Sequence, residues 1–375
     1  MTAPTRRTPG LRQERMRASP QFADGRFVNT YASTAPDTRR EGMTLSMFGE
    51  FMFGGSDRRP VQALPAHDPL SGWHRPSQSG LRVTWLGHST MLLEIDGARV
   101  LTDPVWGLRA SPLSFAGPQR FQRVPVGIGS LPPLDAVLIS HDHYDHLDYA
   151  SVRALAALDV PFVTSLGVGK HLEKWGVPPE RIVELDWWEE AHLASGLTIT
   201  AAPSHHFSGR GLSDRNSTLW SSFALRGERH AVFFSGDTGL SPAFGEIGRR
   251  LGPFDVAAIE VGAFHPAWGD IHLGPENALR AWKELGSGRL LPVHWGTFDL
   301  ALHDWHQPAE VLIANAPEGL VMPRLGEAIE PAHAEGVDPW WRAVARARDA
   351  VRGVAKSASQ SVGFGAGAAA PLTDR

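Results

Sequence analysis

The chain has 375 residues and a formal net charge of −4, with 42% hydrophobic and 20% charged residues. This composition is typical of a globular protein, and the charge provides no overall positive field for binding nucleic acid. Cysteine is absent, which excludes disulfides, thiolate metal sites and cysteine nucleophiles, whereas the 17 histidines direct attention to metal or acid–base chemistry.

The first part of the chain is basic. Residues 1–40 contain many arginines and few acidic residues, which predicts an irregular N-terminal arm. Apolar side chains are then crowded between Met43 and Phe53, and they predict either a segment buried against the core or a lip that contacts a membrane. The sequence contains no run of 18 apolar residues, and no apolar leader follows Arg6 and Arg7. We therefore expect a cytoplasmic protein, with peripheral contact at the inner membrane face as the second interpretation of Met43–Phe53.

Short apolar runs separated by turn signals begin near residue 80. They predict strands at residues 81–87, 90–96, 98–102, 134–140, 197–202, 218–226, 230–235, 255–261 and 289–294. Helices are expected at residues 149–158, 167–175, 242–251, 275–285 and 308–315. Asp96-Gly97 is a strong hairpin signal. Early strands form hairpins and later strands alternate with helices, which predicts two packed sheets with helices outside.

The last part of the chain, residues 327–375, is rich in alanine and glycine. Asp338 is a good helix N-cap, and Pro339 suits the first helical position. The helix that follows carries regularly spaced apolar residues and several arginines, so it either packs on its own domain or lies on an anionic membrane. Residues 357–375 are expected to form a disordered tail.

The run from His141 to His146 is the strongest chemical signal in the sequence. It contains His141, His143, Asp145 and His146 and follows directly after the apolar run 134–140. Without a ligand these groups would be costly to bring together, whereas around a divalent cation their proximity is favourable. A pair of metal ions needs about four ligands each. Further ligands are therefore expected after other apolar runs, at His205 or His206, Asp237 and His294.

These motifs resemble the metallo-β-lactamase superfamily and, more narrowly, the N-acyl-phosphatidylethanolamine phospholipase D family. The similarity covers about residues 20–326 and includes Leu-Thr-Asp-Pro at 101–104, Asp-Trp-Trp-Glu-Glu at 186–190 and His-Trp-Gly-Thr-Phe at 294–298. The resemblance implies an α/β protein built as an αββα sandwich. A hydrolase domain would span residues 41–326, between the basic arm and the C-terminal helix and tail.

The resemblance also implies two zinc ions at the edge of the sandwich, with iron or manganese as alternatives. One ion would be bound by His141, His143 and His206, and the other by Asp145, His146 and His294, with Asp237 shared between them. The family places the ligand just before an aromatic residue, which selects His206 over His205. Adjacent side chains of an extended chain point to opposite faces, so one of the two is expected to reach the metal.

Supporting roles follow from the same resemblance. Asp103 would orient a ligand histidine, and His272 would hold the substrate phosphate at the mouth of the site. His205 would lie behind the ligands or face the substrate, and Trp188 would pack against the floor of the site. The catalytic group would consist of Asp145, Asp237 and His272.

The implied activity is hydrolysis of a phosphodiester, in the family an N-acyl-phosphatidylethanolamine that is cleaved to an N-acylethanolamine and phosphatidic acid. The expected partner is a phospholipid or a small phosphodiester. A lactonase or another small-molecule hydrolase of the same fold is the main alternative, because the same metal site can promote attack on carbon. A di-iron oxidoreductase would usually need a flavin-binding domain, whose Gly-rich signature is absent from the sequence. The complete set of ligands argues against a non-catalytic metal-binding protein.

Overall fold

The computed structural model of the chain describes residues 9–34, 57–265, 270–316 and 318–347. The apolar segment Met43–Phe53 and the predicted tail at residues 357–375 lie outside the described residues.

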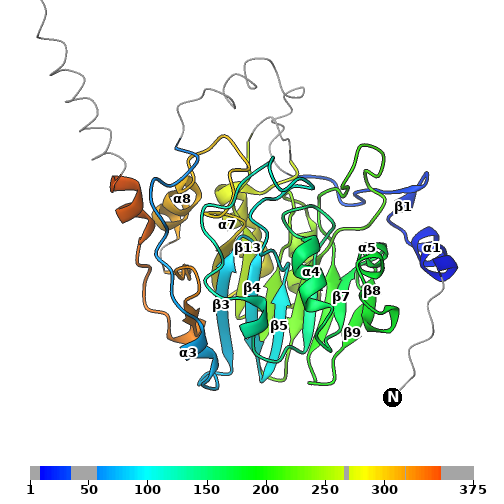
Figure 1. Cartoon of the computed structure of the whole chain (residues 1–375), viewed down its shortest axis with the longest axis horizontal. Coiled ribbons are helices and arrows are strands. Elements are labelled where there is room, and N and C mark those ends of the chain that lie inside the picture. Colours follow the sequence, from blue (N-terminus) through cyan, green and yellow to red (C-terminus); the bar gives the residue numbers. More distant parts are fainter. Residues whose placement is uncertain (1–8, 35–56, 266–269, 317, 348–375) are drawn as a thin grey trace, which may run out of the picture.

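Two β-sheets face each other and helices cover the outer face of each, so the fold is the predicted αββα sandwich (Figure 1). The first sheet consists, in spatial order, of β15 (Ala328–Ile329), β3 (Leu81–Gly87), β4 (Thr90–Ile95), β5 (Ala98–Thr102), β6 (Ala136–Ile139), β7 (Phe162–Ser165) and β8 (Ile182–Leu185). The second sheet consists of β14 (Arg289–Val293), β13 (Val256–Glu260), β12 (Ala231–Phe234), β11 (Ser222–Arg226), β10 (Thr198–Ala202) and β9 (Glu190–His192).

The helices form the outer layers. Side chains of α4 (Tyr149–Leu155) and α5 (Gly169–Lys174) share a buried cluster with the first sheet. The second sheet is covered by α6 (Ala243–Leu251), α7 (Gly274–Leu285) and α8 (Gln307–Asn315). The shorter elements are α1 (Pro9–Ala18), the hairpin β1 (Phe22–Ala23) and β2 (Arg26–Phe27), α3 (Leu70–Trp73), and 3-10 turns at Ile128–Ser130, Pro179–Arg181 and Pro331–His333.

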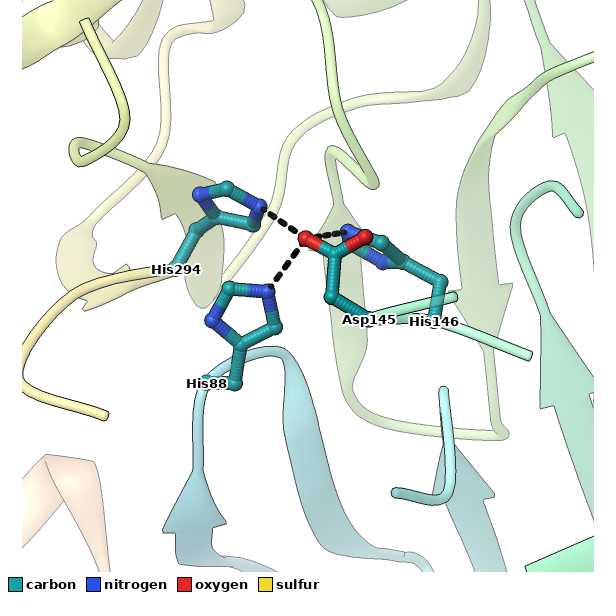
Figure 2. A group of neighbouring side chains, drawn as sticks. All are labelled: His88, Asp145, His146 and His294. Carbon is teal, nitrogen blue, oxygen red and sulfur yellow. Dashed lines mark hydrogen bonds and ion pairs between the residues drawn. The ribbon is translucent and has the colours of Figure 1, made fainter. Parts of the chain in front are cut away.

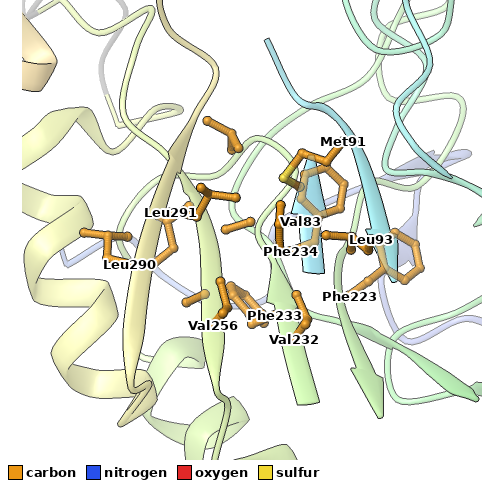
Figure 3. Packing of buried hydrophobic residues seen from close by; sticks show 14 of the residues in the cluster. Val83, Met91, Leu93, Phe223, Val232, Phe233, Phe234, Val256, Leu290 and Leu291 are labelled. Atoms are coloured by element: carbon orange, nitrogen blue, oxygen red, sulfur yellow. The ribbon is translucent and has the colours of Figure 1, made fainter. Parts of the chain in front are cut away.

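Alternation along the strands builds the interior between the two sheets. Met91 and Leu93 of β4 join Phe223 and Phe234 of the second sheet in one buried cluster (Figure 3). Leu92 belongs instead to the cluster under α4 and α5, because successive side chains of a strand point to opposite faces. Both faces of β4 are therefore buried, which explains why its sequence is continuously apolar around these residues.

The strands and helices predicted from residue 80 onwards are all present, in most cases with shorter ends. Four further strands beyond residue 80, β7, β8, β9 and β15, are not predicted by the sequence. Each has only two to four residues, which is too short for an apolar period to be recognised.

The N-terminal arm differs from the expected irregular segment. Its described part forms helix α1 and a short hairpin. The Arg12 guanidinium donates to Glu184 at 2.7 Å and to Glu173 at 2.5 Å, and the ring of Phe27 is fully buried. Arg12 therefore pairs with acidic residues that are distant in the sequence, and composition alone cannot show such pairs.

The C-terminal helix packs on its own domain in its described part. Trp340, Trp341 and Val344 are buried in the main cluster, and the rings of Trp340 and Trp341 lie 5.6 and 5.8 Å from that of Trp295. Nothing in the described part of the chain forms a helix with the length and apolar character needed to cross a membrane.

Replacing Phe234 by alanine should lower the free energy of unfolding by about 3–5 kcal/mol, because it removes a fully buried ring from the contact between the sheets. Denaturant unfolding followed by circular dichroism measures this loss. The control is Leu158→Ala at an exposed position, which should change the stability by no more than about 0.5 kcal/mol. Equal effects of the two substitutions would contradict the packing described here.

Candidate metal centre

Four strand ends meet at one edge of the sandwich, and each precedes residues that the sequence singles out. The run 141–146 follows β6, whereas His206, Asp237 and His294 follow β10, β12 and β14. Strands β12, β13 and β14 are parallel, and β10 runs in the same direction because both it and β12 are antiparallel to β11. The carboxyl ends of these strands therefore share one edge, which is where sites form in such sheets.

The run 141–146 folds into a tight turn after β6. The N–H groups of His146 and Leu147 donate to the carbonyl oxygen of His143, at 3.1 and 2.8 Å. This turn lets side chains that are close in sequence contribute to two neighbouring groups of candidate ligands.

The first group contains His141, His143, His206 and Asp237, whose candidate ligand atoms all lie within 4.8 Å of one another. His143 Nδ1 lies 2.8 Å from His141 Nε2 and 3.3 Å from His206 Nε2. The three histidines are those that the resemblance assigns to one metal ion.

The second group contains Asp145, His146 and His294 together with His88, again within 4.8 Å. Figure 2 shows the three imidazoles directed toward the carboxylate of Asp145. Its Oδ2 lies 3.0 Å from His88 Nε2, 3.3 Å from His294 Nε2 and 3.5 Å from His146 Nε2. The residues expected to bind the second metal ion are thus close together, and His88 joins them.

Asp237 lies between the two groups. Its Oδ2 is 3.8 Å from His141 Nε2 and 3.7 Å from His206 Nε2 in the first group, and 3.1 Å from His146 Nε2 in the second. Its Oδ1 is 3.3 Å from His294 Nε2. This carboxylate is therefore placed where a ligand shared by two ions would be needed.

His88 is a residue of the second group that the sequence analysis does not assign to the site. It lies in the turn between β3 and β4 with a φ of +55°, and its side chain is buried. The ring packs 4.0 Å from that of His294 and 5.2 Å from that of Phe298. The signal in the sequence is an isolated histidine after an apolar strand, the same context that identifies His294.

Asp103 lies behind both groups, and the resemblance assigns it the role of orienting a ligand histidine. Its Oδ2 accepts a hydrogen bond from His146 Nδ1 at 2.7 Å and another from the Ser140 hydroxyl at 2.6 Å. That hydroxyl also lies 2.9 Å from His141 Nδ1. A carboxylate behind a metal-binding imidazole fixes the orientation of the ring and the position of its proton.

His205 and Trp188 lie apart from the candidate ligands. His205 Nδ1 donates to the carbonyl oxygen of Tyr31 at 2.9 Å, and its Nε2 lies 3.5 Å from Asp270 Oδ2. Trp188 packs against the core, and the guanidinium of Arg250 lies 3.6 Å above its ring. These contacts place neither side chain among the candidate ligands, and the roles that the resemblance implies for them stay predictions.

His272 lies next to both groups. Its ring is 5.1 Å from that of His206 and 5.3 Å from that of His294, and its Nδ1 donates to Glu260 at 2.9 Å. Burial lowers the pKa of His272, but the ion pair with Glu260 outweighs this effect and leaves the pKa raised. An imidazolium at this position would suit an anionic substrate.

Charge at the centre is balanced between carboxylates and imidazoles. Burial acts to raise the pKa of Asp145 and Asp237, but the facing histidines outweigh it and hold both well below the usual range. Burial acts against protonation of His294, and Asp237 and Asp145 nevertheless raise its pKa to about 10. Burial and the neighbouring His294 lower the pKa of His88 to about 3, which keeps it neutral. The ionised carboxylates of Asp145 and Asp237 therefore require positive charge between the two groups of histidines.

The residues present fit divalent metal ions. His146 Nε2 and Asp237 Oδ1 are two of the buried side-chain atoms of the described residues that have no partner with hydrogen-bond geometry, although they lie 3.1 Å from Asp237 Oδ2 and 3.3 Å from His294 Nε2, respectively. Such atoms are rare in folded proteins and call for an explanation, for which a bound ion is sufficient. Imidazole and carboxylate donors without thiolate suit zinc, iron or manganese.

Two donor groups that share a carboxylate, at one edge of an αββα sandwich, define a metal-dependent hydrolase of the metallo-β-lactamase type. The sequence comparison agrees with this class, because residues 98–295 match the family described as a beta-lactamase superfamily domain. The chain belongs to the metallo-β-lactamase superfamily.

Relatives extend this similarity over more of the chain. An uncharacterized protein of Mycobacterium tuberculosis is 48% identical over 331 residues, which cover 86% of this chain and 88% of that protein. The N-acyl-phosphatidylethanolamine-hydrolyzing phospholipase D 1 of Caenorhabditis elegans is 38% identical over 264 residues, 67% of this chain and 74% of that protein. The structure of an isothiocyanate hydrolase from Delia radicum gut bacteria shares the fold, with a TM-score of 0.53 and 22% identity over 66% of this chain and 98% of that chain.

Replacing Asp237 by alanine should reduce the metal content from close to two ions per chain to near zero, because one carboxylate contacts both donor groups. Elemental analysis of the folded variant measures the change. Loss of only one ion would show that Asp237 serves a single site.

His206→Ala should weaken the binding of one metal ion and abolish hydrolysis, because His206 Nε2 faces His143 and Asp237. The neighbouring variant His205→Gln is the matched control, since His205 contacts Tyr31 and Asp270. It should retain both ions and a substantial part of the activity. Metal content and hydrolysis measured together test the assignment, and the reverse outcome would contradict it.

Proposed function

We propose that this hydrolase is a binuclear zinc phosphodiesterase of the phospholipase D type. Its substrate would be a phospholipid of the N-acyl-phosphatidylethanolamine class, cleaved to an N-acylethanolamine and phosphatidic acid. The observation that carries the proposal is the position of Asp237 between two groups of imidazoles, with His272 beside them. The name of the Caenorhabditis elegans relative supports the substrate class.

The candidate ligands are suited to holding two cations at a fixed separation. His141, His143 and His206 would hold one, Asp145, His146 and His294 the other, and Asp237 both. When bound, two such cations polarise a phosphoryl oxygen and lower the pKa of water toward about 7.

His272 would supply a positive hydrogen-bond donor for the substrate. Its side chain is 10% exposed, so a ligand at the centre can reach it. The ion pair with Glu260 raises its pKa, and charge-assisted hydrogen bonds to phosphate oxygens are strong. A phosphodiester benefits from this charge throughout the reaction, whereas a neutral lactone has no anionic oxygen to pair with it in the ground state.

A cavity with a partly apolar lining, which also includes Arg109, Asp148 and Arg210, supports a lipid substrate. The cavity, of about 460 Å³, lies beside Tyr144, which stands between two candidate ligands in the sequence, and Leu108 and Leu113 also line it. Phe115, two residues after Leu113, is 77% exposed, and Leu212 is fully exposed. We take Phe115, which follows this lining in the sequence, as the candidate contact with a lipid surface. A peripheral contact with the membrane surface is part of the proposal.

The test presents purified metal-loaded protein with vesicles of N-acyl-phosphatidylethanolamine, vesicles of phosphatidylcholine, a short water-soluble phosphodiester and a lactone. We expect release of N-acylethanolamine from the first, detected by mass spectrometry, with zinc found by elemental analysis. Hydrolysis of the lactone alone would replace the proposal with the lactonase alternative.

A variant separates the lipid surface from the chemistry. Phe115→Ser should reduce cleavage in vesicles several-fold and leave cleavage of the short diester unchanged, because the exposed ring would act only at a membrane. Cleavage of vesicles and soluble diester at the same rate by both proteins would overturn the membrane contact while retaining the phosphodiesterase.

A further inference from the structure

Glu260 is a buried carboxylate that neither the motifs nor the expected ligand set includes. It is the last residue of β13, which lies between β12 and β14, the two strands that precede Asp237 and His294. Its side chain is completely buried. A fully buried carboxylate is costly unless its oxygens are paired, so the contacts of Glu260 indicate what it does.

Both oxygens of Glu260 are occupied by groups from loops of the site. Oε1 accepts hydrogen bonds from the backbone N–H of Thr238 at 2.9 Å and of Leu273 at 3.2 Å. Oε2 accepts from His272 Nδ1 at 2.9 Å and lies 4.0 Å from His294 Nδ1. One carboxylate thus connects the loop of Asp237 with the segment that carries His272.

The contact determines which nitrogen of His272 is left for a ligand. Because Nδ1 donates to Glu260, Nε2 is the ring nitrogen that can meet a substrate. The ring lies about 5 Å from the rings of His206 and His294, beside both donor groups. Asp103 makes the equivalent contact with His146 on the other sheet, where its Oδ2 accepts from Nδ1 at 2.7 Å.

We propose that Glu260 is a positioning residue that holds the imidazole of His272 beside the metal-binding histidines, with Nε2 available to bind a phosphate oxygen. The inference rests on the proposed function, because it takes a phosphate group as the ligand. Glu260 acts through His272, so its effect on phosphate should disappear when His272 is already replaced.

The experiment is a double-mutant cycle read by phosphate binding. Isothermal titration calorimetry measures the affinity of metal-loaded protein for inorganic phosphate in wild type, Glu260→Gln, His272→Gln and the double variant. Each single variant should bind phosphate about 10-fold more weakly, the lower end of what loss of such a supporting carboxylate costs. The double variant should be no weaker than either single variant, and all four proteins should keep their metal content.

The glutamine at 260 is chosen for its shape. Its amide oxygen can still accept from Thr238 and Leu273, whereas its NH₂ group cannot accept the Nδ1 proton of His272. The control is Glu184→Gln, since Glu184 is also buried and accepts two backbone N–H groups, those of Gly167 and Gly169, in the other sheet. This control should lower thermal stability and leave the affinity for phosphate unchanged.

Several outcomes would overturn the proposal. One is a double variant whose loss of phosphate affinity equals the product of the two single losses. Another is a Glu260→Gln variant that binds phosphate as tightly as the wild type or that loses metal. The last is a wild type that does not bind phosphate. If Glu260→Gln does not fold, Glu260→Asp replaces it, because the shorter side chain cannot keep all contacts. Its loss should again vanish when His272 is replaced.

The readout is separate from the test of the proposed function. A non-additive cycle, together with no cleavage of N-acyl-phosphatidylethanolamine in vesicles, would retain the Glu260–His272 pair and reject the lipid substrate. Vesicle cleavage together with an additive cycle would retain the function and reject the pair.

Discussion

Two carboxylates at the centre, the buried Asp237 and the largely buried Asp145, set the condition that the rest of this structure meets. An ionised carboxylate away from water costs several kcal/mol unless positive charge faces it. In this protein imidazoles from both sheets surround the pair, and a divalent cation is the charge that these donors suit best. The strands that precede these residues must therefore end at the same edge of the sandwich. The parallel strands β12 to β14 and the facing strand β6 meet this requirement.

A second layer of carboxylates controls the imidazoles. Asp103 follows β5 in the first sheet and Glu260 ends β13 in the second, and each accepts the Nδ1 proton of a histidine at the centre. Each also accepts backbone N–H groups, from Ser140 to Asp103 and from Thr238 and Leu273 to Glu260. Ring orientation at the centre therefore depends on contacts formed deep in both sheets, which couples the site to the packing of the sandwich.

The fold could be predicted from the sequence wherever elements were long enough to show a period. Strand β4 and the hairpin at Asp96-Gly97 are examples, since both are local signals. Strands β7 and β8 have four residues each and are recognised only by their pairing, β7 with β6 and β8 with β7. The helix and hairpin in the described part of the basic arm could not be predicted, because the ion pair of Arg12 with Glu184 joins residues distant in sequence that composition cannot associate.

The sequence by itself determined the chemistry: no thiol, a dense run from His141 to His146, and single histidines or aspartates after apolar strands. These features depend on residue type and local spacing, which a linear chain contains. Only the tertiary structure decided which isolated residues join the centre. His88 and Glu260 lie beside it because β3 and β13 end at the same edge as β6 and β14, whereas His205 points toward Tyr31. Such proximity depends on how the sheets pack, and side-chain direction depends on strand register, so neither can be read from the order of residues alone.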